Sequence, residues 1–553
     1  MTRGEHRIAE PELRILEEFP TRSTFDVVVV GGGPNGLIAA AYLSRAGLRV
    51  ALVERRQEIG GGLSTEETLF PGYYTNPHAF YHMMTDYLPV LSDFDLRVHG
   101  LYFVKPNAQA AALFPDGTSL LLCHQLEDTK DSLATVSPAD AAAFGRVMRT
   151  WRRIVDDLLA PGTYLPALSP IDMIEAMERT DVGREALRLT ELSPIEIVDE
   201  TFDNDRVRAL MLYVSCMWGL DPRESGLGFM VPLMIDRAMN KAQCYGGSHK
   251  LAGALSREIH KAGGIVLDNA EVTRIIVEHG AVTGVECFDG RVLEAKAVLS
   301  SLAPPITFGK LIDPVAVPAE LTEAATHWEW DKWSFFTLSL ATDTVPRYRA
   351  DDPWVDDALM VLLGFGTTDD VLAHYDAVAT GQLGSVLGGH ATVETRYDPT
   401  LTRLPGHQVS FLQMHAPYDV DDGWDAAGPD VTAELLALWR RHCDGVEPEH
   451  VLRQSVESPV DIETRLTSMV RGSIKHGDYN PLQMGSFRPN ASCVAGRSPI
   501  EGLYLCGSSS YPGGLVIGGP GYIAAGSVVE DLAAERWWRT PRFMARYQEQ
   551  YLS

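Results

Sequence analysis

The sequence lacks the features that define several large classes of proteins. It has only seven cysteines in 553 residues, and no two stand in a C-x-x-C or similar short spacing. An odd number of scattered cysteines argues against a disulfide framework, a zinc site and a dithiol redox centre. The most apolar stretch, residues 27–43, is broken by four glycines, so no membrane span is predicted. No signal peptide is visible at the N-terminus, and we expect a cytoplasmic protein.

Basic side chains are also scarce. Lys and Arg number 47 against 74 Asp and Glu, which gives a net charge of −27. Such a charge repels a phosphate backbone and argues against nucleic acid as a partner and against simple docking on anionic lipid. The hydrophobic fraction of 45% and charged fraction of 22% are typical of a folded globular protein.

A glycine-rich motif follows the first apolar segment. Residues 25–30 (FDVVVV) predict a buried strand, residues 34–46 a helix, and residues 49–53 a second strand. The turn between the first strand and the helix contains Gly31, Gly33, Pro34, Asn35 and Gly36 in a G-x-G-x-x-G pattern. In this pattern the first glycine makes the turn, the second admits a pyrophosphate to the helix N-terminus, and the third allows close helix–strand packing.

A carboxylate ends the second strand of this unit. Glu54 lies 18 residues after Gly36, where an acidic side chain accepts hydrogen bonds from adenosine ribose hydroxyls. Acidity at this position favours a ribose without a 2′-phosphate. The βαβ unit therefore predicts a dinucleotide site, which NAD and FAD could both fill.

The residues after Glu54 distinguish the two cofactors. Gly60, Gly61 and Gly62, followed by Ser64 and Thr65, resemble the E-x5-G-G-x3-[ST] continuation of flavoproteins in the amine oxidase and phytoene desaturase superfamily. Position 62 is a glycine where amine oxidases usually carry arginine. The sequence Thr65-Glu66-Glu67 is more similar to the phytoene desaturase-like branch, in which carotenoid desaturases and isomerases are found.

Two further segments carry the same resemblance. Residues 502–521 resemble the strand, loop and helix that bind the flavin ribityl chain, and residues 245–272 resemble the middle segment, in which the Val272 backbone meets adenine. The resemblance implies FAD as the cofactor. In these two segments it implies cofactor contacts at Val272, Gly507, Ser508, Gly514 and Val516.

The alternation of helices and strands indicates an α/β fold. We predict a Rossmann-like FAD-binding domain of the glutathione reductase type, with a second α+β substrate domain. The FAD-binding domain would combine residues 25–105, 241–310 and 456–535, and the substrate domain residues 106–240 and 311–455. Residues 1–24 would form an N-terminal arm and residues 536–553 a C-terminal helix. The aromatic and arginine residues of that helix suit packing on the protein itself or contact with a membrane surface.

Four polar residues are candidates for the chemistry. His78 and His82 are four apart, and Pro77 before them predicts a helix that would place both on one face. No third ligand accompanies them, so we expect no metal site. His476 and Asp478 shortly precede the flavin-binding C-terminal segment and are comparable candidates.

The resemblance implies an FAD-dependent oxidoreductase that moves a hydride from a C–H bond of an apolar or conjugated small molecule to flavin N5, leaving a C=C bond. Oxygen or a quinone would then accept the electrons, because no second dinucleotide motif is evident. Alternatives are a flavin-dependent isomerase or saturase of polyene-like substrates, a flavin amine oxidase, and a non-catalytic lipid- or prenyl-binding protein of the same fold. Peripheral membrane contact and homo-oligomerisation stay open.

Overall fold

The first β-sheet is built around the run of buried β-branched residues near the N-terminus. The computed structural model describes residues 20–553, so residues 1–19 of the predicted N-terminal arm lie outside the described residues. Five strands are parallel, in the order β20-β12-β1-β2-β9, and β11 and β10 extend the sheet beyond β12 in antiparallel fashion. The strands are β1 (Arg22–Val30), β2 (Val50–Val53), β9 (Ile265–Leu267), β10 (Val272–Glu278), β11 (Ala281–Cys287), β12 (Val292–Ser300) and β20 (Leu503–Leu505).

Three helices pack beside this sheet: α1 (Pro34–Arg45), α11 (His249–Lys261) and α17 (Gly519–Asp531). Helix α1 lies between the other two and is almost fully buried. It begins with proline at its first position, where a missing N–H costs no hydrogen bond, and it ends before Gly47, whose φ is +85°. The predicted strand–helix–strand unit is therefore present, with ends within three residues of the predicted ones.

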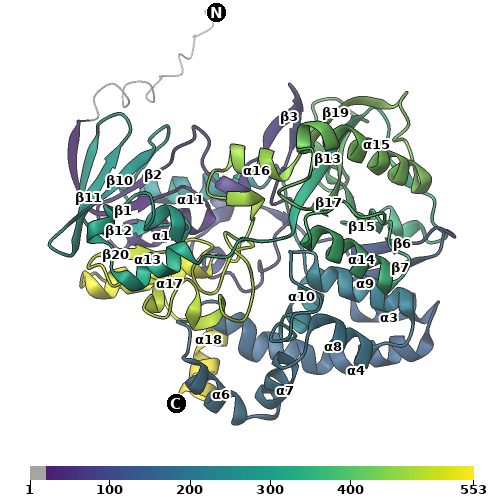
Figure 1. Ribbon diagram of the computed structural model, residues 1–553, viewed down its shortest axis with the longest axis horizontal. Helices are drawn as coiled ribbons and strands as arrows, with labels where there is room; N and C mark the ends of the chain where they lie inside the picture. The colour runs from purple at the N-terminus through teal and green to yellow at the C-terminus, as the bar shows by residue number, and fades with distance from the viewer. Residues whose placement is uncertain (1–19) are drawn as a thin grey trace, which may run out of the picture.

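A second, mostly antiparallel sheet stands beside the first (Figure 1). Its strand order is β19-β13-β17-β16-β15-β6-β7, and only the β15–β6 pair is parallel. The strands are β6 (Ala108–Leu113), β7 (Ser119–Cys123), β13 (Ser334–Thr342), β15 (Val361–Leu363), β16 (Gly389–Val393), β17 (Gln408–Ala416) and β19 (Val451–Glu457). Helices α14 (Thr368–Ala379) and α15 (Trp424–His442) accompany this sheet.

The helical segment between β7 and β8 occupies the lower part of Figure 1. Ser137, Ser169 and Ser193 each cap a helix by accepting a backbone N–H three residues on, as their Ser-Pro sequences predict. The helices of this segment are α3 (Leu126–Ala134), α4 (Pro138–Ile154), α5 (Ala160–Gly162), α6 (Pro170–Glu178), α7 (Asp181–Thr190), α8 (Pro194–Thr201), α9 (Asp205–Cys216) and α10 (Met230–Ala238).

Shorter elements join these layers. Three two-stranded pairs are β3 (Glu66–Phe70) with β4 (Tyr73–Thr75), β5 (Phe103–Val104) with β8 (Gln243–Cys244), and β14 (Arg347–Tyr348) with β18 (Cys443–Asp444). The remaining α-helices are α2 (Val90–Asp93), α12 (Pro304–Thr307), α13 (Ala319–Thr326), α16 (Pro459–Arg465) and α18 (Arg542–Tyr547).

Two predicted helices differ in the structure. Residues 76–84 form no helix, because the His82 backbone instead pairs with Ala242 in both directions, at 2.8 and 3.0 Å. The helix predicted over residues 536–553 begins only at Arg542. Between α17 and α18 the chain is irregular and carries Trp537 and Trp538 back onto α1.

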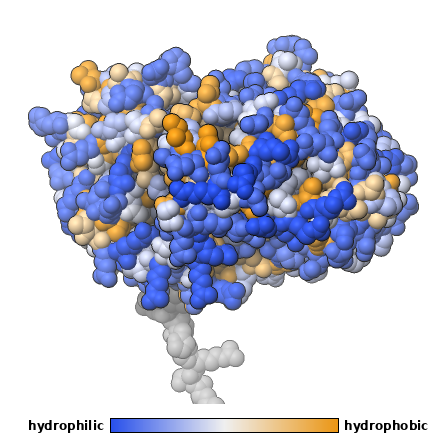
Figure 2. Space-filling model, turned by 90° about the horizontal axis from the view of Figure 1, so that it is seen from below, coloured by the Kyte–Doolittle hydropathy of each residue, from blue (hydrophilic) through white to orange (hydrophobic). Residues whose placement is uncertain are grey.

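Within residues 20–553, no helix combines the length and the apolar character needed to cross a bilayer. The face drawn in Figure 2 is largely hydrophilic, with hydrophobic residues in small groups between polar ones.

Candidate active site

The glycine turn after β1 forms a cradle with one open position. A Cβ atom on Gly36 would lie 2.1 Å from the Gly31 carbonyl oxygen, and one on Gly31 would lie 2.2 Å from Ser301 Oγ. Both positions therefore require glycine because protein atoms fill the space. Around Gly33, in contrast, a Cβ would meet nothing within 4 Å. This is the position where the backbone would approach a pyrophosphate at the N-terminus of α1.

Glu54 lies directly after β2, at the carboxyl edge of the parallel strands. Its Oε2 accepts the Gly32 N–H at 2.8 Å and its Oε1 accepts the Arg56 N–H at 2.8 Å. Two backbone donors thus fix the carboxylate beside the glycine turn. Each oxygen keeps a lone pair that can accept a hydrogen bond from a ribose hydroxyl.

A continuous cavity of about 390 Å³ passes along this edge and reaches the second sheet. The predicted cofactor residues Gly31, Gly33, Pro34, Asn35, Glu54, Gly61, Gly62, Val272, Gly507, Ser508 and Val516 all line it. Gly36, Gly60 and Gly514 do not. Gly36 packs on the turn, Gly60 donates its N–H to the Gly32 carbonyl at 2.8 Å, and Gly514 donates its N–H to the Tyr479 hydroxyl at 2.8 Å.

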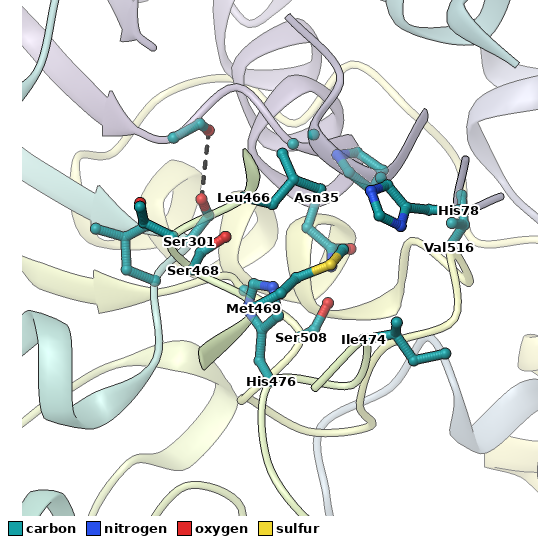
Figure 3. Close-up of a pocket in the computed structure, with 18 of the residues that line it drawn as sticks. Asn35, His78, Ser301, Leu466, Ser468, Met469, Ile474, His476, Ser508 and Val516 are labelled. Carbon is teal, nitrogen blue, oxygen red and sulfur yellow. Dashed lines mark hydrogen bonds between the residues drawn. The ribbon is translucent and has the colours of Figure 1, made fainter. Parts of the chain in front are cut away.

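Unpartnered polar atoms of the cavity lining indicate that the cavity is built for a ligand. Asn35 Oδ1, His78 Nε2 and His476 Nδ1 are buried and have no hydrogen-bond partner among the described residues. Figure 3 shows the three side chains around one space, from the N-terminus of α1, the loop after β4 and the loop after α16. Because buried polar atoms in native proteins are generally paired, these atoms fit a bound cofactor or substrate.

Three residues other than glycine with left-handed backbone line the same cavity. His476, Leu515 and Val516 line the cavity and have φ values of +56°, +70° and +56°. Left-handed backbone is rare for residues other than glycine, above all for a β-branched one, and it persists where surrounding structure enforces it. The loop before α17 is thus held in one conformation against the cavity.

The four predicted polar candidates separate into two pairs. His78 and His476 line the cavity, whereas His82 and Asp478 do not. His82 Nε2 instead lies 3.3 Å from Ser248 Oγ. The Asp478 side chain lies 3.4 Å from the Asn480 amide, and its carbonyl accepts from Gln483 and Arg488. His78 and His82 therefore do not share one face of a helix. Residues 20–553 also contain no group of three His, Cys, Asp or Glu side chains placed to hold a metal ion.

Burial keeps both cavity histidines neutral. It lowers the pKa of His78 to about 3 and the pKa of His476 to about 4. A neutral imidazole can donate one hydrogen bond and accept another. Because the protonated form is so disfavoured, these side chains suit hydrogen bonding to a cofactor or substrate better than proton abstraction.

A buried charge network supports the loop that carries His476. Lys475 forms an ion pair with Asp331, and its ammonium also donates to the Trp218 carbonyl at 2.7 Å. Arg488 is fully buried and donates to the carbonyls of Lys475, Asp478, Gln483 and Ser508. These bonds tie residues 475–488 to Ser508, which also lines the cavity.

Sequence reasoning missed most of the side chains that line the rest of the cavity, which come from loops, the second sheet and the helical segment. Phe80, Tyr81, Met83, Trp218, His390, Gln413, Met469 and Ile474 all line the cavity. They come from separate parts of the chain and have no shared spacing. The only available signal was the position of Phe80, Tyr81 and Met83 beside the predicted His78.

Comparison with known proteins places this arrangement in a family. Residues 35–519 match the family described as flavin containing amine oxidoreductase. The protein belongs to this family. The chain is 37% identical over 533 residues to a limonene dehydrogenase polypeptide of Castellaniella defragrans, covering 93% of this chain and 96% of that one. It is 25% identical over 517 residues to a zeta-carotene-forming phytoene desaturase of Myxococcus xanthus, covering 88% and 90%.

Solved structures of flavin containing amine oxidoreductases share the fold. Cyclohexylamine oxidase of Brevibacterium oxydans superposes with a TM-score of 0.59 at 18% identity, covering 92% of this chain and 99% of that one. The predicted α/β flavoprotein fold is confirmed. The protein is an FAD-containing oxidoreductase, and the open position at Gly33, the Glu54 carboxylate and the unpartnered Asn35 fit that cofactor.

Proposed function

We propose that this oxidoreductase is a dehydrogenase that removes hydrogen from a largely apolar small molecule and leaves a C=C bond, as expected of the phytoene desaturase-like branch. Relatives named for limonene and for carotene-type substrates support the proposal, since both names denote isoprenoid hydrocarbons.

One observation carries the proposal. The part of the cavity beyond the predicted flavin residues is lined by Phe80, Tyr81, Met83 and Trp218. Phe80 and Tyr81 are buried, and their rings meet edge to face at 4.5 Å. The acidic residues that line the cavity, Glu54 and Glu271, are at the end expected to hold adenosine. An apolar molecule therefore gains by entering, whereas a cation there would lose its hydration without an acidic partner.

FAD, when bound, supplies the hydride acceptor. The chain's own residues hold the substrate C–H bond in place and exclude water. The neutral His78 and His476 would hydrogen-bond to groups in the cavity, and the loop of residues 507–516 would support the cofactor.

We also propose an external electron acceptor such as oxygen or a quinone. The glycines Gly364 and Gly366 lie between β15 and α14. The strand after α14, β16, pairs antiparallel with β15, whereas a dinucleotide-binding βαβ unit has parallel strands. The Asp370 carboxylate accepts the Gly366 N–H at 2.8 Å and would repel a phosphate there.

An amine oxidase has less support from the site. Such enzymes would cage an amine between aromatic rings just before the helix α17. Here Leu515 and Val516 line that position. Tyr511 donates its hydroxyl to the Gly162 carbonyl at 2.8 Å, and Tyr522 packs on Tyr42 with ring centroids 5.3 Å apart. Neither tyrosine lines the cavity.

The visible spectrum of the purified protein tests the proposal. Under anaerobic conditions, an isoprenoid hydrocarbon such as limonene should bleach the oxidised-flavin bands, and a panel of primary amines should not. Bleaching by amines alone would contradict the dehydrogenase proposal and support an amine oxidase activity. Exchange of substrate isomers without net bleaching would instead support an isomerase.

A further inference from the structure

The wall of the cavity formed by the second sheet carries polar groups that a pure hydrocarbon does not need. His390 on β16 and Gln413 on β17 are direct partners in the antiparallel ladder, so both side chains are on one face of the sheet. Both line the cavity, together with Tyr81 from the loop after β4. None of these residues belongs to the elements that carry the cofactor motifs.

The hydrogen-bond partner of His390 fixes which of its ring nitrogens carries the proton. The imidazole is buried and neutral, because burial and the nearby Lys241 side chain oppose its protonation and lower its pKa. Its Nδ1 is 2.8 Å from the Tyr213 hydroxyl. Because that hydroxyl has no other acceptor among the described residues, we assign it as the donor to Nδ1. The imidazole proton is then on Nε2, which has no partner within residues 20–553 and is a free donor.

Tyr81 supplies a second free donor. Its hydroxyl is buried and has no hydrogen-bond partner among the described residues. Burial and the neighbouring Tyr213 raise the pKa of Tyr81 well above its ordinary value, so the hydroxyl keeps its proton. Lys241 Nζ lies 5.4 Å from the centroid of the Tyr81 ring and donates to the Ala238 carbonyl at 2.7 Å. The four side chains thus form one buried cluster beside the cavity.

We propose that Tyr81 and His390 form a subsite for a carbonyl oxygen, and that the substrate is a compact apolar skeleton bearing one carbonyl group. A carbonyl oxygen has two lone pairs and no proton, which matches two free donors. One N–H of the Gln413 side-chain amide is already used, because it donates to Thr337 Oγ1 at 2.8 Å. A cationic amine is disfavoured because Tyr213 and Lys241, the ionisable side chains beside Tyr81 and His390, offer it no carboxylate partner. This inference rests on the proposed function and narrows its substrate class.

Binding of two matched ligands tests the subsite. Carvone and limonene share one ten-carbon skeleton, and carvone has a carbonyl in place of a CH₂ group. Calorimetric titration of the purified, flavin-loaded protein, with the flavin reduced beforehand so that no turnover occurs, gives the dissociation constant of each under anaerobic conditions. Tyr81→Phe removes only a hydroxyl without a partner, so the variant should fold. We expect it to weaken carvone binding about tenfold, the value of one hydrogen bond of about 1.4 kcal/mol, with less than about a twofold change for limonene.

Tyr164→Phe is the matched control. Tyr164 is also buried with an unpartnered hydroxyl, but it does not line the cavity, so its loss should change neither dissociation constant. Equal carvone affinities of the wild-type and Tyr81→Phe proteins, including no binding to either, would overturn the subsite.

Flavin bleaching recorded beside these titrations separates the two proposals. If limonene bleaches the flavin and Tyr81→Phe leaves the carvone affinity unchanged, the dehydrogenase proposal is supported and the subsite proposal is contradicted. If Tyr81→Phe loses carvone affinity as expected but no isoprenoid bleaches the flavin, the subsite proposal is supported and the dehydrogenase proposal is contradicted.

Discussion

Gly33 and Gly36 belong to one motif but meet different physical requirements. At Gly36 the space for a side chain is filled by the Gly31 carbonyl of the protein itself. At Gly33 the space is open, and φ is −69°, which any residue can adopt. The motif therefore combines a requirement of folding with a requirement of binding, and substitution can separate them.

Alanine at each position should show this difference. We expect Gly36→Ala to destabilise the cofactor-free protein by about 3 kcal/mol, because a methyl group must displace backbone. Gly33→Ala should leave cofactor-free stability unchanged and weaken FAD binding by at least about tenfold, or ~1.4 kcal/mol. Denaturant unfolding and FAD titration of the apoprotein measure the two quantities. A Gly33→Ala protein that binds FAD like the wild type would contradict the assigned phosphate position.

Glu394 is a buried acid whose ionisation opposes folding. It is 1% exposed, and burial raises its pKa from 4.5 to about 8 although Asn76 donates two hydrogen bonds to Oε1. Between pH 4.5 and about pH 8, Glu394 of the folded protein keeps a proton that it has released in the unfolded chain. Stability is therefore lost as pH rises, by up to about 1.4 kcal/mol per pH unit from this group.

Glu394→Gln should remove this dependence. Glutamine keeps an acceptor for Asn76 and has no proton to lose, so the variant should be more stable than the wild type at pH 8, with the advantage shrinking toward pH 5. Denaturant midpoints at several pH values measure the slope. The exposed Glu178→Gln serves as the control and should leave the slope unchanged. Parallel slopes for wild type and Glu394→Gln would show that Glu394 is ionised in the folded protein.

At the scale of elements, the irregular segment before α18 fastens the C-terminus to α1. The Trp537 ring stacks on Tyr42 with centroids 5.5 Å apart, and its Nε1 donates to the Tyr42 carbonyl at 3.1 Å. The Arg45 guanidinium lies 3.9 Å from the centroid of the Trp537 ring. The sequence left two roles open for the aromatic residues of this segment, packing on the protein itself and contact with a membrane surface. The contacts of Trp537 are packing on the protein itself.

Trp537→Ala should therefore destabilise the fold by about 2 kcal/mol, less than the loss of a fully buried tryptophan because the ring is partly exposed. Thermal or denaturant unfolding measures the change. Trp354 is 46% exposed, so Trp354→Ala is the matched control and should cost less than about 0.5 kcal/mol. A Trp537→Ala protein as stable as that control would show that the stacking contributes nothing.

Across the molecule as a whole, the cavity joins both sheets. Its lining combines the glycine turn after β1 with Val272, the loop of His476 and the second-sheet residues His390 and Gln413. Segments distant in the sequence thus share one internal surface. A ligand that fills it contacts several of them at once and should stabilise the folded protein as a unit.

Removal of FAD should accordingly lower the stability of the molecule. At a free FAD concentration about a thousandfold above Kd, binding adds about 4 kcal/mol to the free energy of unfolding. The midpoint of thermal unfolding should rise with added FAD, and Gly33→Ala should need correspondingly more cofactor for the same rise. A midpoint that does not respond to FAD in the wild-type protein would contradict this account of the cavity.

The glycine-rich edge of the cavity could be predicted from local sequence. The strand, turn and helix around residues 31–36 and the carboxylate of Glu54 are local features, because strand propensity, a glycine turn and a proline-started helix act over a few residues. The caps at Ser137, Ser169 and Ser193 were predictable for the same reason.

The part of the cavity lined by the second sheet and by Tyr81 depends on long-range packing. Pairing of His82 with Ala242 replaced the helix predicted after Pro77, since a distant segment offered backbone partners that a short isolated helix could not match. Likewise, His390 and Gln413 reach the cavity only through the register of β16 and β17, and Tyr81 meets Lys241 only after the chain has closed on itself. No spacing in the sequence encodes such contacts, because they depend on how separate elements pack.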